Sequence, residues 1–191
     1  MCPLESDNEK HTYTEDIKYS LNTDSSYDFI TLAANINCND SIKMVMIQHE
    51  FGLFKKEYYF KHFLKLLNKP VILAFHTVLP RPNESLKMLV HDIANLCESL
   101  IVMTNTSAKI LVDDYGIFQE QISVIPHGTH LVSHSDKAIL KEKYNVSGRK
   151  TLSTFGLLSS GKSIETTLDA MPAIIEKNPD VLFLIIGKTH P

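Results

Sequence analysis

Short apolar runs that alternate with amphipathic segments are the feature that most constrains this fold. The apolar runs predict strands at 44–48, 71–75, 100–103, 122–125, 152–155 and 181–186. Helical periodicity predicts helices at 26–37, 58–67, 84–97, 107–115, 135–144 and 164–177. Alternating strands and helices predict parallel strands joined by right-handed crossovers, hence an α/β, Rossmann-like parallel sheet. Because the runs lack in–out alternation, we expect the strands to be covered on both faces.

A polar, charged stretch at 132–150 marks a candidate domain boundary. We expect an irregular segment at 1–24, a partial Rossmann-like domain at 25–146, and the first strand, helix and strand of a second such domain at 147–191. The chain has 43% hydrophobic residues, enough for a core.

Charge and cysteine usage narrow the class of protein. The formal net charge of −3 does not indicate a nucleic-acid partner. The three cysteines form no CxxC pair, which predicts reduced thiols and a cytoplasmic location. The polar, acidic N-terminus is unlike a signal peptide, and no apolar run is long enough to cross a bilayer.

Histidines follow three of the predicted strands. His49, with Glu50, follows the first of them, His76 follows the next, and His127 lies in the sequence Pro-His-Gly after a third. Ligands of open parallel sheets bind beyond the carboxyl ends of the strands, so these side chains are candidate ligand contacts. Each could instead be structural, and the Pro-His-Gly sequence could simply be a turn. A metal site is not predicted, because HEFGL has Leu53 where the zinc pattern HExxH needs its second histidine.

The segment FGLLSSGKSIE supports two interpretations. Gly156, Gly161, Lys162 and Ser163 match the P-loop pattern G-x-x-x-x-G-K-S between a strand and a helix. In a P-loop nucleotide-binding protein, Lys162 would reach phosphates and Ser163 would bind magnesium. Against this, the next strand ends in Gly187 where a magnesium-binding aspartate is usual. The alternative is a tight strand-to-helix turn closed by Gly161.

Six motifs, in order, resemble the family 4 (group 1) glycosyltransferases of the GT-B fold. They are IQHEFGLF, AFHTVLP, IVMTNTSAKILVDDYGI, ISVIPHGTH, FGLLSSGKSIE and LIIGKTHP. The resemblance spans about 160 residues, from near Ser26 to the C-terminus. Members of that family have two Rossmann-like domains, the first holding mainly the acceptor and the second mainly a nucleotide-sugar donor.

The resemblance implies roles for individual residues. Lys162, at the start of a helix with Gly156, Gly161 and Ser163, corresponds to the lysine that contacts the donor diphosphate. His76 corresponds to the histidine that faces the transferred sugar, while His49 and Glu50 match a motif on the acceptor side.

The implied reaction transfers a hexose from a nucleotide-diphosphate sugar to a sugar or lipid hydroxyl, with retention of configuration. No D-x-D triplet occurs, which agrees with metal-independent transfer. No cofactor is expected beyond the donor substrate itself.

The chain also departs from the family pattern. Ser163 replaces a common glycine, and Leu157 and Leu158 occupy a stretch where an arginine is usual. The first strand of the first domain and the nucleotide-binding carboxylate of the second are not found, so we expect a portion of a longer enzyme. A degenerate, non-catalytic chain is a further alternative, and it predicts exposed apolar surface around 181–186.

Lysines and aromatic residues share the segment 55–69. This pattern permits peripheral contact with an anionic membrane surface, although a solvated helix face explains it as well.

Overall fold

The computed structural model describes residues 1–7, 11–54 and 56–189. The chain divides into two units, residues 1–129 and 130–191, and each is described by itself. The expected division lay at 146/147, so α5 (Lys137–Lys143) falls in the second unit. Hydrogen bonds explain this grouping: Lys141 donates to the carbonyl of Arg149, whose guanidinium donates to the carbonyls of Asp180 and Val181 at 2.9 and 2.8 Å.

The first unit contains six strands and four α-helices within the described residues. They are β1 (Leu4–Glu5), β2 (Leu21–Asn22), α1 (Ser26–Cys38), β3 (Val45–His49), α2 (Glu57–Leu66), β4 (Val71–Phe75), α3 (Glu84–Asn95), β5 (Ser99–Val102), α4 (Asn105–Asp113) and β6 (Ile122–Val124). A short 3₁₀ turn, Gln119–Gln121, precedes β6.

Side-chain caps fix where three of these helices begin. Ser25 accepts a hydrogen bond from the backbone N–H of Asp28 at the start of α1. Asn83 and Thr104 do the same for α3 and α4. Each cap satisfies an amide that the helix itself leaves without a partner, and so favours that starting point over its neighbours.

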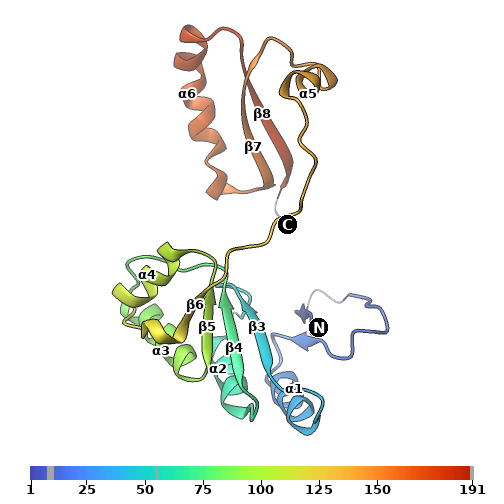
Figure 1. Cartoon of the computed structure of the whole chain (residues 1–191), viewed down its shortest axis with the longest axis vertical. Helices are drawn as coiled ribbons and strands as arrows, with labels where there is room; N and C mark the ends of the chain where they lie inside the picture. The colour runs from blue at the N-terminus through green and yellow to red at the C-terminus, as the bar shows by residue number, and fades with distance from the viewer. Residues whose placement is uncertain (8–10, 55, 190–191) are drawn as a thin grey trace. The chain divides into compact units, whose positions relative to one another are not determined.

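The main sheet has the strand order β3-β4-β5-β6, and all three pairings are parallel (Figure 1). This confirms the predicted α/β class with a Rossmann-like strand–helix arrangement. His49 pairs with Phe75 in the β3–β4 register, so the carboxyl ends of the two strands lie level. Side chains that follow these strands therefore emerge at one edge of the sheet.

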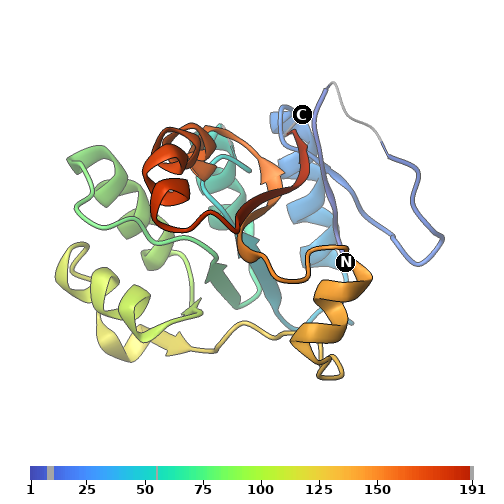
Figure 2. The same ribbon diagram turned by 90° about the horizontal axis from the view of Figure 1, so that it is seen from above.

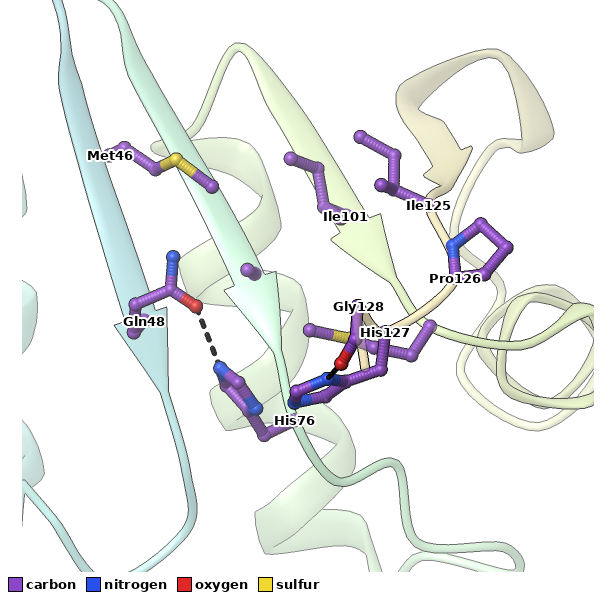
Figure 3. Close-up of a pocket in the computed structure, with 10 residues that line it drawn as sticks. Met46, Gln48, His76, Ile101, Ile125, Pro126, His127 and Gly128 are labelled. Carbon is purple, nitrogen blue, oxygen red and sulfur yellow. Dashed lines mark hydrogen bonds between the residues drawn. The ribbon is translucent and has the colours of Figure 1, made fainter. Parts of the chain in front are cut away.

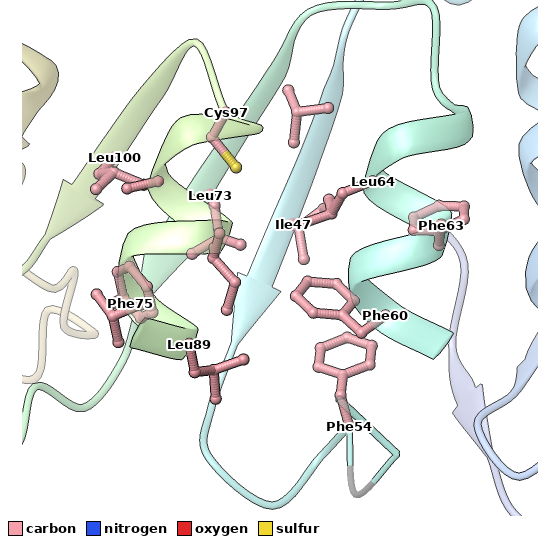
Figure 4. Close-up of a cluster of buried hydrophobic side chains, with 14 of the residues drawn as sticks. Ile47, Phe54, Phe60, Phe63, Leu64, Leu73, Phe75, Leu89, Cys97 and Leu100 are labelled. Atoms are coloured by element: carbon pink, nitrogen blue, oxygen red, sulfur yellow. The ribbon is translucent and has the colours of Figure 1, made fainter. Parts of the chain in front are cut away.

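One face of this sheet packs against helices (Figures 2 and 4). Strand residues facing them include Ile47, Leu73, Phe75 and Leu100, and the helices contribute, among others, Phe60, Leu64, Leu89 and Ile93. All eight are at most 9% exposed. Burial of each such side chain stabilises the fold by roughly 1.5–3 kcal/mol.

The expectation that both faces are covered is wrong for β3. Ile47 and His49 are buried, but Met46 and Gln48, which point the other way, are exposed. The reason is the strand order. The chain steps from β3 to β6 in one direction, and right-handed crossovers that step in one direction place every connecting helix on the same face.

The second unit contains β7 (Lys150–Leu158), a 3₁₀ turn (Ser160–Lys162), α6 (Ile164–Lys177) and β8 (Val181–Thr189), in addition to α5. Strands β7 and β8 pair in parallel over nine residues. Among the described residues of this unit only Val181 is buried, whereas Phe155 is 72% and Ile186 55% exposed. The exposed apolar surface expected of a non-catalytic chain is therefore present around these strands.

Candidate functional site

A pocket of about 240 Å³ lies at the carboxyl ends of the strands of the first unit, on the face away from α2 and α3 (Figure 3). It is lined by Met46, Gln48, Ala74, His76, Ile101, Met103, Ile125, Pro126, His127 and Gly128. The residues within the strands form an apolar floor, and the polar groups stand at the strand tips. The pocket thus occupies the place where the strand-end argument expects a ligand.

His76 is held at this edge by both its backbone and its ring. Its backbone N–H donates to the carbonyl of His49 at 2.9 Å, which continues the β3–β4 ladder by one residue. Its ring Nε2 donates to Oε1 of Gln48 at 2.7 Å. The ring also lies beside that of His127, with centroids 6.1 Å apart. The structure therefore brings together two of the three strand-end histidines.

The loop that follows His76 is anchored at several points. The hydroxyl of Tyr115, a fully buried residue, donates to the carbonyl of Leu79 at 2.8 Å. The carboxylate of Asp114 accepts from the backbone N–H of Arg81 at 2.8 Å. Arg81 has φ of 53°, a left-handed conformation that these contacts hold in place. The loop is fixed at the point where His76 enters the pocket.

Glu50 joins two loops and does not line the pocket. One carboxylate oxygen accepts from the backbone N–H of Phe51 at 2.9 Å, and the other accepts from the Thr77 hydroxyl at 2.7 Å. The loop after β3 is thereby tied to the loop after β4. This geometry gives Glu50 a positioning role, and its contact with an acceptor hydroxyl stays a prediction.

The expected convergence of His49 with His76 is wrong. His49 is 4% exposed and its ring lies on the helix-covered face, with Phe51, Phe54, Phe60 and Phe75 around it at centroid distances of 5.1–5.7 Å. Period-2 alternation explains the outcome, because adjacent strand residues point to opposite faces. Gln48 faces the pocket, and His49 must then face the core.

The environment of His49 favours a neutral ring. Burial lowers the pKa of His49 to about 4, an effect that the nearby charge of Glu50 only partly offsets. Within the described part of the chain its Nδ1 has no hydrogen-bond partner. His49 is therefore a core residue with an unsatisfied polar atom, and it does not line the pocket.

Gln48 is the pocket residue that the sequence interpretation overlooked. A signal was present: Gln48 is separated by one residue from Met46, so alternation places both on one face, and it immediately precedes the end of the strand. His127 was weighed as a turn residue, and the structure places it on the pocket wall, where its Nδ1 donates to the carbonyl of Gly128 at 2.8 Å.

The second unit carries the other candidate residues. Lys162 is exposed, and its ammonium lies 3.7 Å from the position that a Cβ on Gly156 would occupy. Gly156 lies opposite Gly187 in the β7–β8 register, and a Cβ on Gly187 would come within 1.9 Å of the carbonyl oxygen of Gly156. Only glycine fits at position 187, so the two backbones can approach closely there.

The start of α6 adds a second favourable feature for an anion. Ser163 is its N-cap, adopts φ of 48°, and makes no side-chain cap hydrogen bond. The first amides of the helix therefore have no cap from that hydroxyl, and the positive end of the helix dipole lies next to Lys162. Gly161, the middle residue of the 3₁₀ turn, has no positive φ, and a Cβ there would make only an ordinary contact with the Ser159 hydroxyl at 3.8 Å.

The geometry differs from that of a P-loop. Gly156 lies inside β7, which continues to Leu158, and Ser163 is a left-handed residue outside the helix. In a P-loop the chain wraps a phosphate between the strand and the first helical turn, where the lysine and serine stand. The nine-residue strand leaves too few residues for that wrap.

Metal and membrane features are limited in the described ranges. No group of three or more His, Cys, Asp or Glu side chains could hold a metal ion there. Within the same ranges no helix has the length and apolar character needed to cross a membrane. Of the basic segment 55–69, Lys55 lies outside the described residues, Lys61 pairs with Asp92 at 2.9 Å, and Lys56 donates to the Asp24 carbonyl at 2.8 Å.

Solved structures with this fold contain bound UDP. HepE from Anabaena in complex with UDP-glucose aligns with a TM-score of 0.59 and 15% identity, over 84% of this chain and 43% of that one. HepE in complex with UDP and glucose aligns with a TM-score of 0.59 and 17% identity, over 86% of this chain and 44% of that one. MnaA from S. aureus with UDP aligns with a TM-score of 0.55 and 15% identity, over 92% of this chain and 49% of that one.

These likenesses establish the fold and its extent. No protein-family model matches the chain, and no curated protein matches it. The chain spans less than half the length of each of these solved proteins. It has a parallel α/β architecture that resembles the structures of UDP-binding proteins.

Proposed function

We propose that this chain is part of a glycosyltransferase that transfers a hexose from a nucleotide-diphosphate sugar to a sugar or lipid hydroxyl. The observation that carries the proposal is the position of Lys162, whose exposed ammonium lies over bare glycine backbone at the start of α6. The fold supports it, because similar solved structures hold UDP, with glucose in two of them. The motif resemblance to family 4 supports the finer assignment to that family and to retention of configuration.

In this proposal Lys162 stabilises the leaving diphosphate. Negative charge develops on the diphosphate as the bond to the sugar breaks, and a cation already in place lowers the energy of that state. The uncapped amides at the start of α6 and the positive end of its helix dipole also stabilise the negative charge of the diphosphate. The missing side chain of Gly156 leaves room beside the Lys162 ammonium for a phosphate oxygen to approach the backbone.

His76 supplies the sugar-facing group in the first unit. The ring is exposed at the strand tip, and its loop is anchored by Tyr115, Asp114 and the Glu50–Thr77 link. Because the loop is already ordered, the ring of His76 loses little conformational entropy when a ligand binds. This favours affinity and the positioning of the sugar in the transition state. Glu50 contributes through that loop.

Removal of the Lys162 charge tests the proposal. We expect the full chain to bind UDP-glucose in buffer with EDTA, and Lys162→Ala to weaken binding at least about tenfold, because one charge-assisted contact to phosphate contributes roughly 1.5–3 kcal/mol. Lys177→Ala, at an exposed lysine in the last turn of the same helix, is the matched control and should leave binding unchanged. Calorimetric titration measures the UDP-glucose affinity of the native chain and of both variants.

The same titration separates the competing functions. Binding of ATP that requires magnesium and disappears in Ser163→Ala would support the P-loop alternative instead. A chain that binds neither nucleotide while its strands remain folded would support the non-catalytic alternative.

A further inference from the structure

Both imidazoles of the strand-tip pocket donate to an oxygen that can only accept. Nε2 of His76 lies 2.7 Å from Oε1 of Gln48, and Nδ1 of His127 lies 2.8 Å from the carbonyl oxygen of Gly128. Amide and peptide carbonyl oxygens have no hydrogen to give, so each engaged nitrogen must carry one. The two contacts therefore set the tautomers of both rings.

The other nitrogen of each neutral ring is then a bare acceptor. A neutral imidazole holds one N–H, which leaves a lone pair on Nδ1 of His76 and on Nε2 of His127. The rings are neighbours, with centroids 6.1 Å apart and planes at 68°. In Figure 3 the two free nitrogens lie on the facing sides of the rings. Two lone pairs thus converge at the mouth of the pocket.

The rest of the pocket does not suit an anion. Its ten lining residues include no lysine, arginine, aspartate or glutamate. An anion would meet two acceptors with no cation to compensate, and burying it there would be unfavourable. Two imidazoles also fall short of the four ligands that a zinc site usually needs.

A neutral ligand with several hydroxyl groups and an apolar face fits both parts of the pocket. Its hydroxyl hydrogens can satisfy the two lone pairs, while its carbon face packs on the floor of Met46, Ala74 and Ile101. The volume of about 240 Å³ suits one small ligand.

We propose that this pocket binds a sugar ring through hydroxyls that donate to His76 Nδ1 and His127 Nε2, with Gln48 as the positioning residue that fixes the His76 tautomer. The inference rests on the proposed function, since it names the ligand class at the same strand tips. It adds two residues to that site, Gln48 and His127, and excludes the phosphate groups of a substrate from this pocket.

The tautomers are tested first, on the full chain without ligand. Long-range ¹H–¹⁵N NMR at pH 8 should show Nε2–H for His76 and Nδ1–H for His127. Gln48→Leu should shift His76 toward a mixture and leave His127 unchanged. Gln48→Glu should restore Nε2–H, because a carboxylate also accepts. An Nδ1–H tautomer for His76, or no change in Gln48→Leu, would overturn the role of Gln48.

Ligand class is tested next, by following the ring and backbone signals on titration with methyl α-glucoside, inorganic phosphate and Zn²⁺ separately. We expect the glucoside alone to shift His76 and His127. Its affinity should fall about tenfold in Gln48→Leu and in His127→Ala, the effect of losing one hydrogen bond to the ligand, and recover in Gln48→Glu. Shifts with phosphate or zinc and none with the glucoside would refute the proposal.

This result is separable from the fate of the proposed function, because no nucleotide is used. Glucoside binding without any UDP-glucose binding at Lys162 would remove the proposed donor role and leave the pocket assignment standing. UDP-glucose binding with no effect of glucoside on either histidine would remove the pocket assignment and leave the proposed donor role of Lys162 standing.

Discussion

At the carboxyl ends of β3 and β4, two neighbouring histidines have opposite environments: His49 is buried in the core and His76 is exposed to solvent. His49 is surrounded by aromatic rings, and its Nδ1 has no hydrogen-bond partner among the residues that the structure describes, whereas His76 makes two hydrogen bonds at the pocket. The buried ring must be neutral for the fold to be stable. Its burial therefore makes the stability of the first unit sensitive to acid.

The first prediction concerns that sensitivity. The pKa of His49 is lowered from 6.5 to about 4, so between these values the unfolded chain binds a proton that the folded chain does not. Stability is then complete above about pH 6.5 and declines as the pH falls toward 4. The loss approaches roughly 3 kcal/mol, and His49→Phe should abolish it. Urea unfolding at pH 7 and pH 4.5 measures the difference.

Two further variants keep this test specific. His49→Leu should flatten the pH dependence as well, even if its absolute stability differs from that of His49→Phe. His11→Gln, at an exposed histidine of the same unit, should retain the slope of the native chain. Equal slopes in the native chain and both His49 variants would show that His49 is not the acid-sensitive group.

Residue identity alone predicted the strand-end positions but not the direction in which each side chain points. His76 lies where the sequence placed it, and so does Lys162, whose amine is exposed. His49 was misplaced because the predicted strand ended at residue 48, whereas β3 includes His49 and alternation turns its ring toward the helices. The deciding fact was that Gln48 faces away from the helices, and that depends on strand order.

At the scale of elements, the paired glycines hold β7 and β8 together at their tips. Gly187 has φ of 154°, and a Cβ there would lie only 1.9 Å from the carbonyl oxygen of Gly156. No side chain can give way there, because the obstructing atoms are backbone. The strands must separate if any larger residue is introduced.

We expect Gly187→Ala to destabilise this strand pair by at least about 2 kcal/mol, the usual cost of a forced backbone clash. Hydrogen exchange of the β7 and β8 amides reports it as lost protection. Gly161→Ala is the matched control, since a Cβ there meets only the Ser159 hydroxyl at 3.8 Å. Equal protection in both variants would contradict the close approach.

Element positions followed from sequence where local signals were strong. The predicted strand 71–75 and helix 164–177 coincide with β4 and α6. Strands β7 and β8 extend to Leu158 and Thr189, beyond the predicted ends at 155 and 186. Gly156 and Gly187 lie inside the strands and permit two backbones to pair closely, which is a tertiary effect.

At the scale of the whole molecule, the two units differ in how much core each possesses. The first unit buries a continuous apolar cluster between its sheet and helices (Figure 4). The second buries only Val181 among its described residues. Because apolar burial is the main stabilising contribution, the units should differ in local stability.

Native-state hydrogen exchange tests this difference directly. Amides of β4 and β5 should exchange only through global unfolding of the first unit, and those of β7 and β8 should exchange much faster. Saturating UDP-glucose should slow exchange in the second unit, because a ligand that binds the folded form stabilises it. Equally slow exchange in β4 and β7 without ligand would contradict the account.

The most direct test of the central claim is an NMR map of amides perturbed by UDP-glucose in the presence of EDTA. The claim is that ligand binds at the carboxyl ends of the parallel strands. We predict perturbation of residues 156–165 in the second unit and of His76 and its neighbours in the first. Perturbation confined to the opposite ends of the strands, around Ile42 and Met44, or none without magnesium, would contradict it.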